Sequence, residues 1–412
     1  MLDRPSPLIP DDPQEIARRM FTAEAKRNPH AYFDRLRELA PVFHDQDSGL
    51  WFLTEWEDCN RVLRSDRFGQ DGRMKQDPRY PTSVSLQLLG DNLTGMDPPE
   101  HTRLRVLGLK GLSRPVVEGM RTYLQELTAQ VLDELEDRQD FDLVADYAAR
   151  IPSTVICEML GVPREDHHLF DAWVADQFRL LSPIPPSDEL LAETDRSVGA
   201  LLDYLNGLLD ERRRSPRNDL LSAFVATDAT VEQPMTPMEA VHMANVLLGG
   251  GSDTSKSVIT LGMLALLQNP DQMKLLQTDP SNDAKAFEEL IRYTSPVLIA
   301  NPRKSYDDVE IGGRPIPAGD LVAPVLVAAN FDPKVFADPH RLDLRRSPNP
   351  HLAFGHGAHI CMGNMLARGV VGHAVTSLVR RFPDLQMVED SFEPRLDLFA
   401  MQGMKSLKVR KS

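Results

Sequence analysis

The sequence predicts a mainly α-helical protein with a minor β part, folded as one large domain over residues 1–412. Three observations predict this class. Long stretches repeat apolar residues at the three- and four-residue spacing of a helix, whereas strand-like segments are few and short. Hydrophobic residues make up 42% of the chain, enough for a sizeable core. No repeat, low-complexity tract or linker divides the sequence.

Helical spacing appears in five stretches, several of them separated by Pro-rich breaks. The helical stretches are residues 124–136, 190–213, 238–267, 284–293 and 362–382, and the breaks lie at 182–187, 215–216 and 233–237. The strand signals are weaker. Residues 49–53 predict one strand, 309–316 followed by 321–327 predict a hairpin, and 396–401 with 406–409 predict another.

Composition excludes several classes of protein. The net charge of −15 argues against a nucleic-acid binder that works by neutralising phosphates. The three cysteines, Cys59, Cys157 and Cys361, do not form a disulfide framework, which fits a reducing cytoplasm. The first twenty residues are rich in proline and read neither as a signal peptide nor as an anchor. No run of about eighteen uncharged apolar residues predicts a membrane span.

The segment from Phe354 to Gly363 carries the most specific signal. It reads Phe-Gly-His-Gly-Ala-His-Ile-Cys-Met-Gly, and its glycines permit tight turns and the close approach of a flat ligand. A predicted helix follows directly, so Cys361 lies at or just before a helix N-terminus, where the dipole and free N–H groups favour a thiolate. A lone cysteine is more often an inert buried thiol, but the glycine frame favours a metal ligand here.

This pattern resembles the haem-binding loop of the cytochrome P450 superfamily, with every position of its Phe-Gly-x-Gly-x-His-x-Cys-x-Gly filled. The resemblance implies the family fold, in which haem b lies between a long kinked distal helix and the proximal cysteine loop and helix. It implies that Cys361 is the axial ligand of the haem iron, that Phe354 packs against it, and that His359 meets a haem propionate. Gly355 and Gly363 belong to the same haem-binding loop. A thiolate ligand pushes electron density onto iron and favours O–O cleavage.

A second motif, Glu289-Leu-Ile-Arg292, matches the family's E-x-x-R. A glutamate and an arginine three residues apart share one face of a helix, and by themselves they would be an ordinary surface pair. The resemblance implies a structural ion network, and it places Arg341 as the third member.

A third motif lies in the middle of the predicted helix 238–267, where Gly249 to Gly251 precede Ser-Asp253-Thr254. Three glycines there cost roughly 1 kcal/mol each relative to alanine, so local signals leave open a turn between two helices. The Thr254 hydroxyl can bond to a carbonyl one turn earlier and widen a kink. By resemblance to the family's oxygen-activation motif, Thr254 orients protons for dioxygen activation and Asp253 helps to deliver them.

A fourth motif runs from Met96 to Arg105. His101 and Arg105 are four residues apart, so they share a helix face and can clasp a carboxylate. The resemblance assigns both to the haem propionates, together with Arg303 and His359; the alternative for each arginine is a solvated surface charge. The resemblance extends from about Pro29 to Val409, with the motifs in family order.

The implied function is that of a soluble bacterial haem-thiolate monooxygenase, with hydroxylation as the default reaction. No G-x-G-x-x-G motif or further cysteine cluster indicates a fused reductase, so we expect electrons from NAD(P)H to arrive through a separate ferredoxin and ferredoxin reductase. Arg103, Lys110, Arg114 and Arg368 would lie on the proximal side in the family fold. We expect them to dock an acidic ferredoxin, and a merely solvated helix face is the alternative.

The resemblance also places a mostly apolar substrate pocket above the haem. Its expected lining is Leu89, Val246, Gly249, Gly250, Leu298, Ile299, Ala300 and Met401. Each of these could equally be plain core. Gly249 contributes no side chain where many relatives carry a small one, which indicates room above the iron. We therefore expect a lipophilic substrate of moderate size, such as a terpenoid, a steroid-like compound or a polyketide.

Three other functions compete with this interpretation. A haem-thiolate peroxygenase tends to lack the acid–alcohol pair that Asp253 and Thr254 provide. A haem sensor or electron carrier needs no proton relay, so the Asp253-Thr254 segment argues against that function. A structural zinc protein would need a Cys/His spacing that His167 and His168 do not supply.

Overall fold

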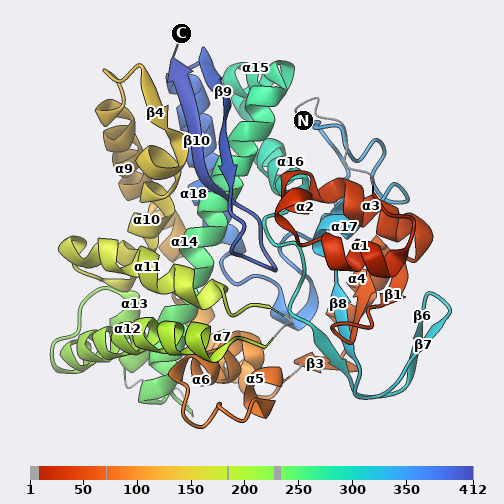
Figure 1. The fold of residues 1–412 in the computed structure, drawn as a ribbon. Helices are drawn as coiled ribbons and strands as arrows, with labels where there is room; N and C mark the ends of the chain where they lie inside the picture. Colours follow the sequence, from red (N-terminus) through yellow and green to blue (C-terminus); the bar gives the residue numbers. More distant parts are fainter. Residues whose placement is uncertain (1–8, 71, 183–184, 227–232, 412) are drawn as a thin grey trace.

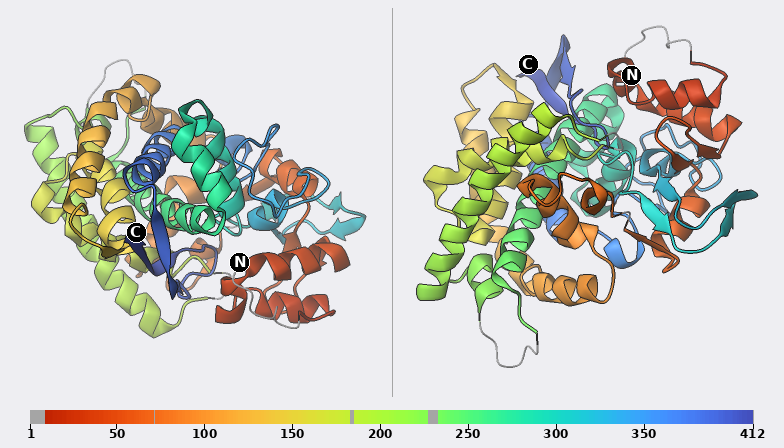
Figure 2. Two further views of the ribbon diagram at one scale, coloured as in Figure 1. Left: turned by 90° about the horizontal axis from the view of Figure 1, so that it is seen from above. Right: turned by 60° about the horizontal axis from the view of Figure 1, so that its bottom comes forward.

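The computed structural model describes residues 9–70, 72–182, 185–226 and 233–411. Helices surround the long α14 (Pro237–Gln268), and the strands of residues 42–70 and 303–324 lie on one side together with the N-terminal helices (Figure 1). The C-terminal strands of residues 385–411 lie apart from them, beside α15 (Pro270–Thr278). Two further views keep α9–α13 on the side opposite to the N-terminal helices and to strands β6 and β7 (Figure 2). The predicted mainly α class with a minor β part is confirmed.

The helices begin and end as follows. They are α1 (Pro13–Arg19), α2 (Ala23–Arg27), α3 (Pro29–Leu39), α4 (Trp56–Arg64), α5 (Arg73–Gln76), α6 (Val84–Asp91), α7 (Glu100–Lys110), α8 (Arg114–Gly119), α9 (Arg121–Glu134), α10 (Arg150–Leu160), α11 (His167–Phe178), α12 (Asp188–Arg214), α13 (Leu220–Val225), α14 (Pro237–Gln268), α15 (Pro270–Thr278), α16 (Asp283–Thr294), α17 (Leu326–Asn330) and α18 (Asn364–Arg381). The five predicted helical stretches correspond to α9, α12, α14, α16 and α18.

The strands form three sheets. They are β1 (Val42–His44), β2 (Leu50–Leu53), β3 (Phe68–Gln70), β4 (Asp140–Asp142), β5 (Arg303–Ser305), β6 (Val309–Ile311), β7 (Arg314–Ile316), β8 (Leu321–Pro324), β9 (Leu385–Pro394) and β10 (Met404–Lys411). One sheet has the order β1-β2-β8-β5-β3, with β2 and β8 parallel and the other pairs antiparallel. A second has the order β4-β10-β9, and β6 pairs with β7 alone.

Both predicted hairpins were partly wrong in their pairing. Residues 309–316 form the hairpin β6–β7 by themselves, turning at Gly312 and Gly313, which have positive φ. The segment that begins at Leu321 pairs instead with β2 and β5. At the C-terminus, β9 takes the place of the expected strand 396–401, which connects β9 to β10. Its apolar residues serve packing: Leu398 is buried, and the Phe399 ring lies 3.9 Å from that of Phe21.

Helix α14 spans 32 residues without a break, so the alternative of a turn at its glycines was wrong. Its start has the expected chemistry. The Thr236 side chain accepts from the backbone N–H of Glu239, the Glu239 side chain accepts from the N–H of Thr236, and Pro237 occupies the first turn.

The largest core cluster lies where α10, α14, α16 and α18 pack together. Because α18 follows the cysteine loop, this packing holds that loop against the middle of α14. Among the described residues, no helix combines the length and the apolar character that crossing a membrane requires.

Candidate active site

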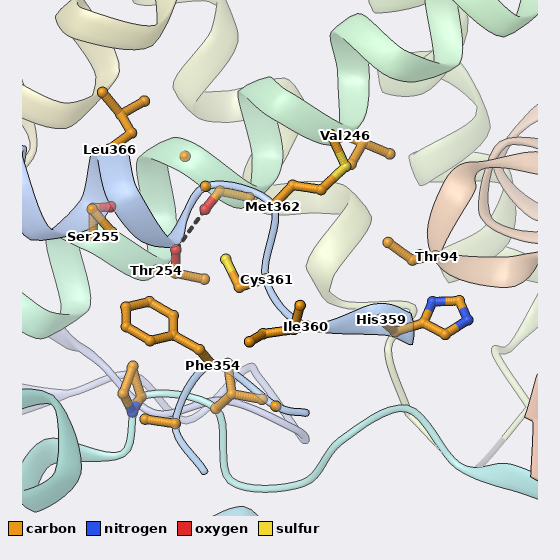
Figure 3. A pocket seen from close by; sticks show the side chains of 18 of the residues that line it. Thr94, Val246, Thr254, Ser255, Phe354, His359, Ile360, Cys361, Met362 and Leu366 are labelled. Carbon is orange, nitrogen blue, oxygen red and sulfur yellow. Dashed lines mark hydrogen bonds between the residues drawn. The ribbon is translucent and has the colours of Figure 1, made fainter. Parts of the chain in front are cut away.

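A cavity of about 330 Å³ lies between α14 and the loop that precedes α18. Cys361 enters it from the loop and Thr254 from α14 (Figure 3). Its wall also contains Phe354, Gly355 and Gly363, so the structure brings the cysteine motif and the distal-helix motif together around one space. The volume is in the range of small-molecule sites.

The cysteine loop is closed by its own backbone. The Cys361 N–H donates to the Phe354 carbonyl oxygen at 2.8 Å, and the Asn364 side chain donates to the Cys361 carbonyl at 2.6 Å. Gly355 has a φ of +67°, which glycine adopts without strain. A Cβ at Gly363 would meet no atom within 4 Å, so the loop is open at this glycine, which also lines the cavity.

Opposing influences act on the Cys361 thiol. Burial raises its pKa, whereas the backbone N–H of Gly363 and the charges of Arg105 and Arg368 lower it, and the pKa stays above its ordinary value. The predicted effect of the helix N-terminus is therefore present but does not outweigh burial. Coordination to a metal ion would deprotonate the sulfur outright.

Four side chains assigned to the haem propionates by resemblance gather at one edge of the cavity. His101 and Arg105 come from α7, Arg303 from β5 and His359 from the 3₁₀ turn Gly357–His359, and all four line the wall. The rings of His101 and His359 lie 4.0 Å apart. Arg105 also donates to the carbonyl oxygen of Ile360, which joins α7 to the cysteine loop.

The electrostatics of this edge favour an anionic ligand. Burial, reinforced by Arg303, His101 and Arg105, lowers the pKa of His359 to about 2, and burial with Arg105 and Arg303 lowers that of His101. Burial also lowers the pKa of Arg105. Both ring nitrogens of His101 are buried without a hydrogen-bond partner in the described chain. A group that carries two carboxylates would accept from the imidazole N–H and balance the charges of Arg105 and Arg303, so the residues present fit a haem.

The glycine-rich part of α14 forms the opposite wall. The Thr254 hydroxyl donates to the Gly250 carbonyl oxygen at 2.6 Å, the bond to the previous turn that the sequence predicted (Figure 3). Gly250 and Gly251 line the cavity, and a Cβ at Gly250 would meet nothing within 4 Å. The helix therefore exposes its backbone here and leaves room beside Thr254.

Asp253 faces a different environment from its neighbour Thr254. It is buried, it is not among the residues of the cavity wall, and both its oxygens accept from Nη1 of Arg395, at 2.8 and 2.9 Å. Lys256 lies 2.5 Å from the same carboxylate. Arg395 also contacts Asp397. The acid predicted to deliver protons is thus held between two cations, away from the cavity.

The E-x-x-R motif forms a buried network. Glu289 accepts from Arg292 through two bonds of 2.8 Å, and both side chains are fully buried. The prediction of Arg341 as the third member was wrong. Arg341 is exposed, and Arg346 reaches Glu289 at 3.1 Å while also donating to the carbonyl oxygens of residues 337, 338 and 341. Arg346 approaches because the chain turns back on itself between these positions.

The predicted substrate pocket is only partly reproduced. Val246, Gly250 and Ala300 line the cavity. Leu298 and Ile299 instead pack into a core cluster with the N-terminal helices, and Leu89, which belongs to α6, packs against a small cluster that contains Leu180 and Leu191. Met401 is buried and pairs with Val297. A Cβ at Gly249 would face Phe178 and Val174 at 3.9 Å, so this glycine points toward α11.

The four residues of the predicted partner face differ in their surroundings. Arg103 contacts Glu100 and Glu239, and Arg368 is ion-paired with Glu288 at 2.6 Å. Arg114 is exposed and pairs with Glu118 one turn later. Lys110 is exposed at the end of α7. Lys110, Arg114 and Arg368 are therefore exposed to solvent, whereas Arg103 is partly buried between two acids.

Several contacts of the site were not predicted. Gln70 lines the cavity, and its side-chain amide lies 3.1 Å from Nε2 of His359. The Arg368 guanidinium lies 4.6 Å from the centre of the Phe354 ring, which stacks on Phe287. Gln70 and Phe287 carry no motif, and only their place in the fold identifies them.

Comparisons with known proteins agree with this geometry. The cytochrome P450 family model matches residues 52–281 and 284–408. The chain is 36% identical over 391 residues to cytochrome P450 monooxygenase PikC of Streptomyces venezuelae, across 93% of this chain and 91% of that protein. It is 35% identical over 375 residues to the vitamin D(3) 25-hydroxylase of Pseudonocardia autotrophica, across 89% and 90%.

A solved structure agrees as well. The structure of P450BioI in complex with hexadec-9Z-enoic acid ligated acyl carrier protein superimposes with a TM-score of 0.89 at 28% identity, over 95% of this chain and 99% of that chain. The family model spans most of the sequence, and the relatives match almost end to end. The chain therefore belongs to the cytochrome P450 family of haem-thiolate monooxygenases.

Proposed function

We propose that this protein inserts one atom of dioxygen into a lipophilic small molecule, with haem b held by Cys361 and with hydroxylation as the default reaction. The observation that carries the proposal is the cavity in which Cys361 faces the Thr254 segment of α14.

We also propose that residues 1–412 form one domain, although residues 1–8 lie outside the described part of the chain.

The proposed haem contacts follow from the cavity wall. Cys361 would supply the axial thiolate, with Phe354, Gly355 and Gly363 beside it. His101, Arg105, Arg303 and His359 would hold the propionates, because they form a buried edge with excess positive charge and an unsatisfied imidazole. When bound, the haem would supply the activation of dioxygen, whose second atom leaves as water.

Thr254 would hold a proton for this chemistry at its hydroxyl. Its own proton goes to the Gly250 carbonyl, so the hydroxyl oxygen remains an acceptor toward the cavity and can orient a water molecule there. Asp253 would relay protons from the protein side. Its carboxylate must first leave Arg395 and Lys256, because both of its oxygens are held by these cations away from the cavity.

Electrons would come from NAD(P)H through a ferredoxin reductase and a ferredoxin. Lys110, Arg114 and Arg368 are the exposed cations of the proposed docking face, and Arg103 contributes less because it is partly buried between Glu100 and Glu239. Reversing both charges in Lys110→Glu/Arg114→Glu should slow reduction by an acidic ferredoxin and flatten its dependence on salt. An unchanged rate would refute this docking face.

The substrate class follows from the lining. Away from the haem edge the wall is largely apolar, with Val246, Leu247, Val297 and Ala300, so it favours a lipophilic compound of moderate size. Two relatives support this class: one is named for vitamin D(3), and another was solved with a fatty acyl carrier protein. A terpenoid, a steroid-like compound or a polyketide would fit. Cytoplasmic localisation accords with the proposed use of soluble electron carriers.

The test is turnover with defined electron donors. Purified protein, ferredoxin, ferredoxin reductase and NADPH are incubated with vitamin D3 and a panel of steroids under labelled dioxygen, and products are analysed by mass spectrometry. The proposal predicts incorporation of one labelled oxygen atom that needs both reductant and dioxygen. Product formation with peroxide alone would indicate a peroxygenase, and haem reduction without any product across a wide panel would favour an electron carrier or sensor.

A further inference from the structure

Helix α4 contacts the cysteine loop and the residues just before it at Trp56, Asn60 and Leu63, although the two segments are almost three hundred residues apart in the chain. The Trp56 indole N–H donates to the Pro350 carbonyl oxygen at 2.8 Å, and Asn60 Oδ1 lies 2.6 Å from Nδ1 of His356, a pair with a separation of 296 residues. At Gly357, a Cβ would lie only 2.2 Å from the Leu63 carbonyl oxygen. The helix and the loop are therefore in direct backbone contact.

The three contacting residues of α4 lie on one helix face. Trp56, Asn60 and Leu63 are spaced at positions i, i+4 and i+7, the spacing of one face of a helix. Asn60 and Leu63 are buried, so the face is covered by the loop and not by water. Asn60 is the single polar member with a side-chain bond to the haem-binding motif itself.

His356 is flanked on both sides by glycine, so its neighbours contribute no side chains that fix the loop. Gly355 and Gly357 flank it with φ of +67° and +70°, conformations that glycine also leaves easily. A side-chain bond at His356 therefore does more to fix this stretch than it would between ordinary residues. The Asn60 side-chain carbonyl oxygen can only accept, so Nδ1 of His356 is the donor in this bond.

A displacement at His356 would reach the sulfur. The loop that contains His356 is closed at its ends by the bond from the Cys361 N–H to the Phe354 carbonyl oxygen. His359 lies between these points and lines the cavity. Moving the middle of a short closed loop changes the orientation of both ends, so the position of the thiolate depends on where His356 is held.

We propose that Asn60 is a positioning residue that acts through His356 to hold the cysteine loop, and thereby sets the environment of the Cys361 thiolate. The inference rests on the haem-thiolate function proposed above. Without this bond, the stretch around His356 would shift against α4 and admit water to the sulfur. Added hydration stabilises the more negative, reduced form of the centre, so the reduction potential should rise.

The test compares two buried asparagines. Asn60→Leu removes the acceptor for His356. Asn282→Leu is the matched control, because Asn282 is also buried and also makes one side-chain bond. That bond goes to the Leu344 carbonyl oxygen at 2.8 Å, and neither Asn282 nor Leu344 lines the cavity. Holoprotein of each variant is examined for its urea midpoint, its one-electron reduction potential, and the share of reduced, carbon-monoxide-bound protein with the thiolate absorption band.

We expect Asn60→Leu to change the equilibrium constant for reduction about tenfold, a rise of about 59 mV for one electron. Hydration of the sulfur should also raise the share of protein without the thiolate band, at least about threefold over the wild type. Asn282→Leu should lower the urea midpoint and leave potential and band unchanged. His356→Leu should reproduce the effect, and the double variant should add little, because both residues act through one interaction.

The outcomes distinguish the haem-thiolate function from the positioning role of Asn60. A wild type without the thiolate band would refute the haem-thiolate function itself. A wild type with the band, beside an Asn60→Leu variant of unchanged potential and band, would refute the positioning role alone, and so would equal shifts in Asn282→Leu. If Asn60→Leu does not bind haem, Asn60→Ser and His356→Leu provide the same comparison.

Discussion

The network at Glu289 gives a sharp contrast between two arginines five positions apart. Arg346 is only 10% exposed and donates from Nε to both oxygens of Glu289, at 3.1 Å. It also donates to three backbone carbonyls. Arg341 is exposed, and in the described structure its side chain makes no ion pair with Glu289. The same substitution, arginine to methionine, should therefore have very different effects at the two positions.

The magnitude follows from what Arg346→Met leaves behind. Glu289 keeps its two bonds from Arg292, so the carboxylate is not stranded, and the full loss of about 3–5 kcal/mol for breaking a buried pair is an upper limit. Losing one charged hydrogen-bonded contact is worth about 1.5–3 kcal/mol. The three carbonyls lie near solvent and can bind water instead. We expect a loss of about 3 kcal/mol for Arg346→Met and under about 0.5 kcal/mol for Arg341→Met.

Urea unfolding followed by circular dichroism measures this difference. With a slope of at least about 3 kcal/mol/M for a chain of this size, Arg346→Met should lower the midpoint by up to about 1 M. Arg341→Met should match the wild type. If Arg341→Met lowers the midpoint as far as Arg346→Met, or if neither variant changes it, the assignment of Arg346 as the third member of the network is refuted.

Three further predictions concern buried charge, pH and the distal wall. Arg395→Gln should destabilise the protein by about 3 kcal/mol in urea because it leaves the buried Asp253 carboxylate with Lys256 alone, and adding Asp253→Asn should recover most of that loss. Burial lowers the pKa of His30 to about 3, so below about pH 6.5 the unfolded chain binds a proton that the folded protein does not. The free energy of unfolding should therefore decrease as the pH is lowered below about 6.5, by up to about 1.4 kcal/mol per pH unit. His30→Phe should make urea midpoints at pH 7 and pH 5 more nearly equal. Gly250→Val should weaken the spectral shift induced by vitamin D3, because its side chain would enter the cavity.

Local sequence patterns located the helices well. The predicted stretch 238–267 corresponds to Pro237–Gln268, because the capping residues and the apolar spacing act within a few residues of each other. The glycines at 249–251 made a break plausible, yet the helix continues, since packing against α10 and α18 stabilises it more than three glycines weaken it. Strand pairing depends on distant segments, so the partner of Leu321–Pro324 could not be predicted from its neighbours.

The candidate site was predictable to the extent that it consists of motifs. Cys361, Thr254, His101 and Arg303 line one cavity, as the ordered motifs indicated. The Asp253 side chain turned out to bind Arg395, a residue 142 positions away that no motif marks. Interactions of this kind depend on how separate elements meet in space, and a single sequence does not contain that information in local form.

The central claim is that Cys361 binds haem iron as a thiolate. The most direct measurement is the absorption spectrum of the reduced, carbon-monoxide-bound protein, beside that of Cys361→Ser. The account predicts a strongly red-shifted Soret band in the wild type that is absent in the variant. A band typical of histidine-ligated or thiol-ligated haem in the wild type, or a protein that takes up no haem when haem is abundant, would contradict it.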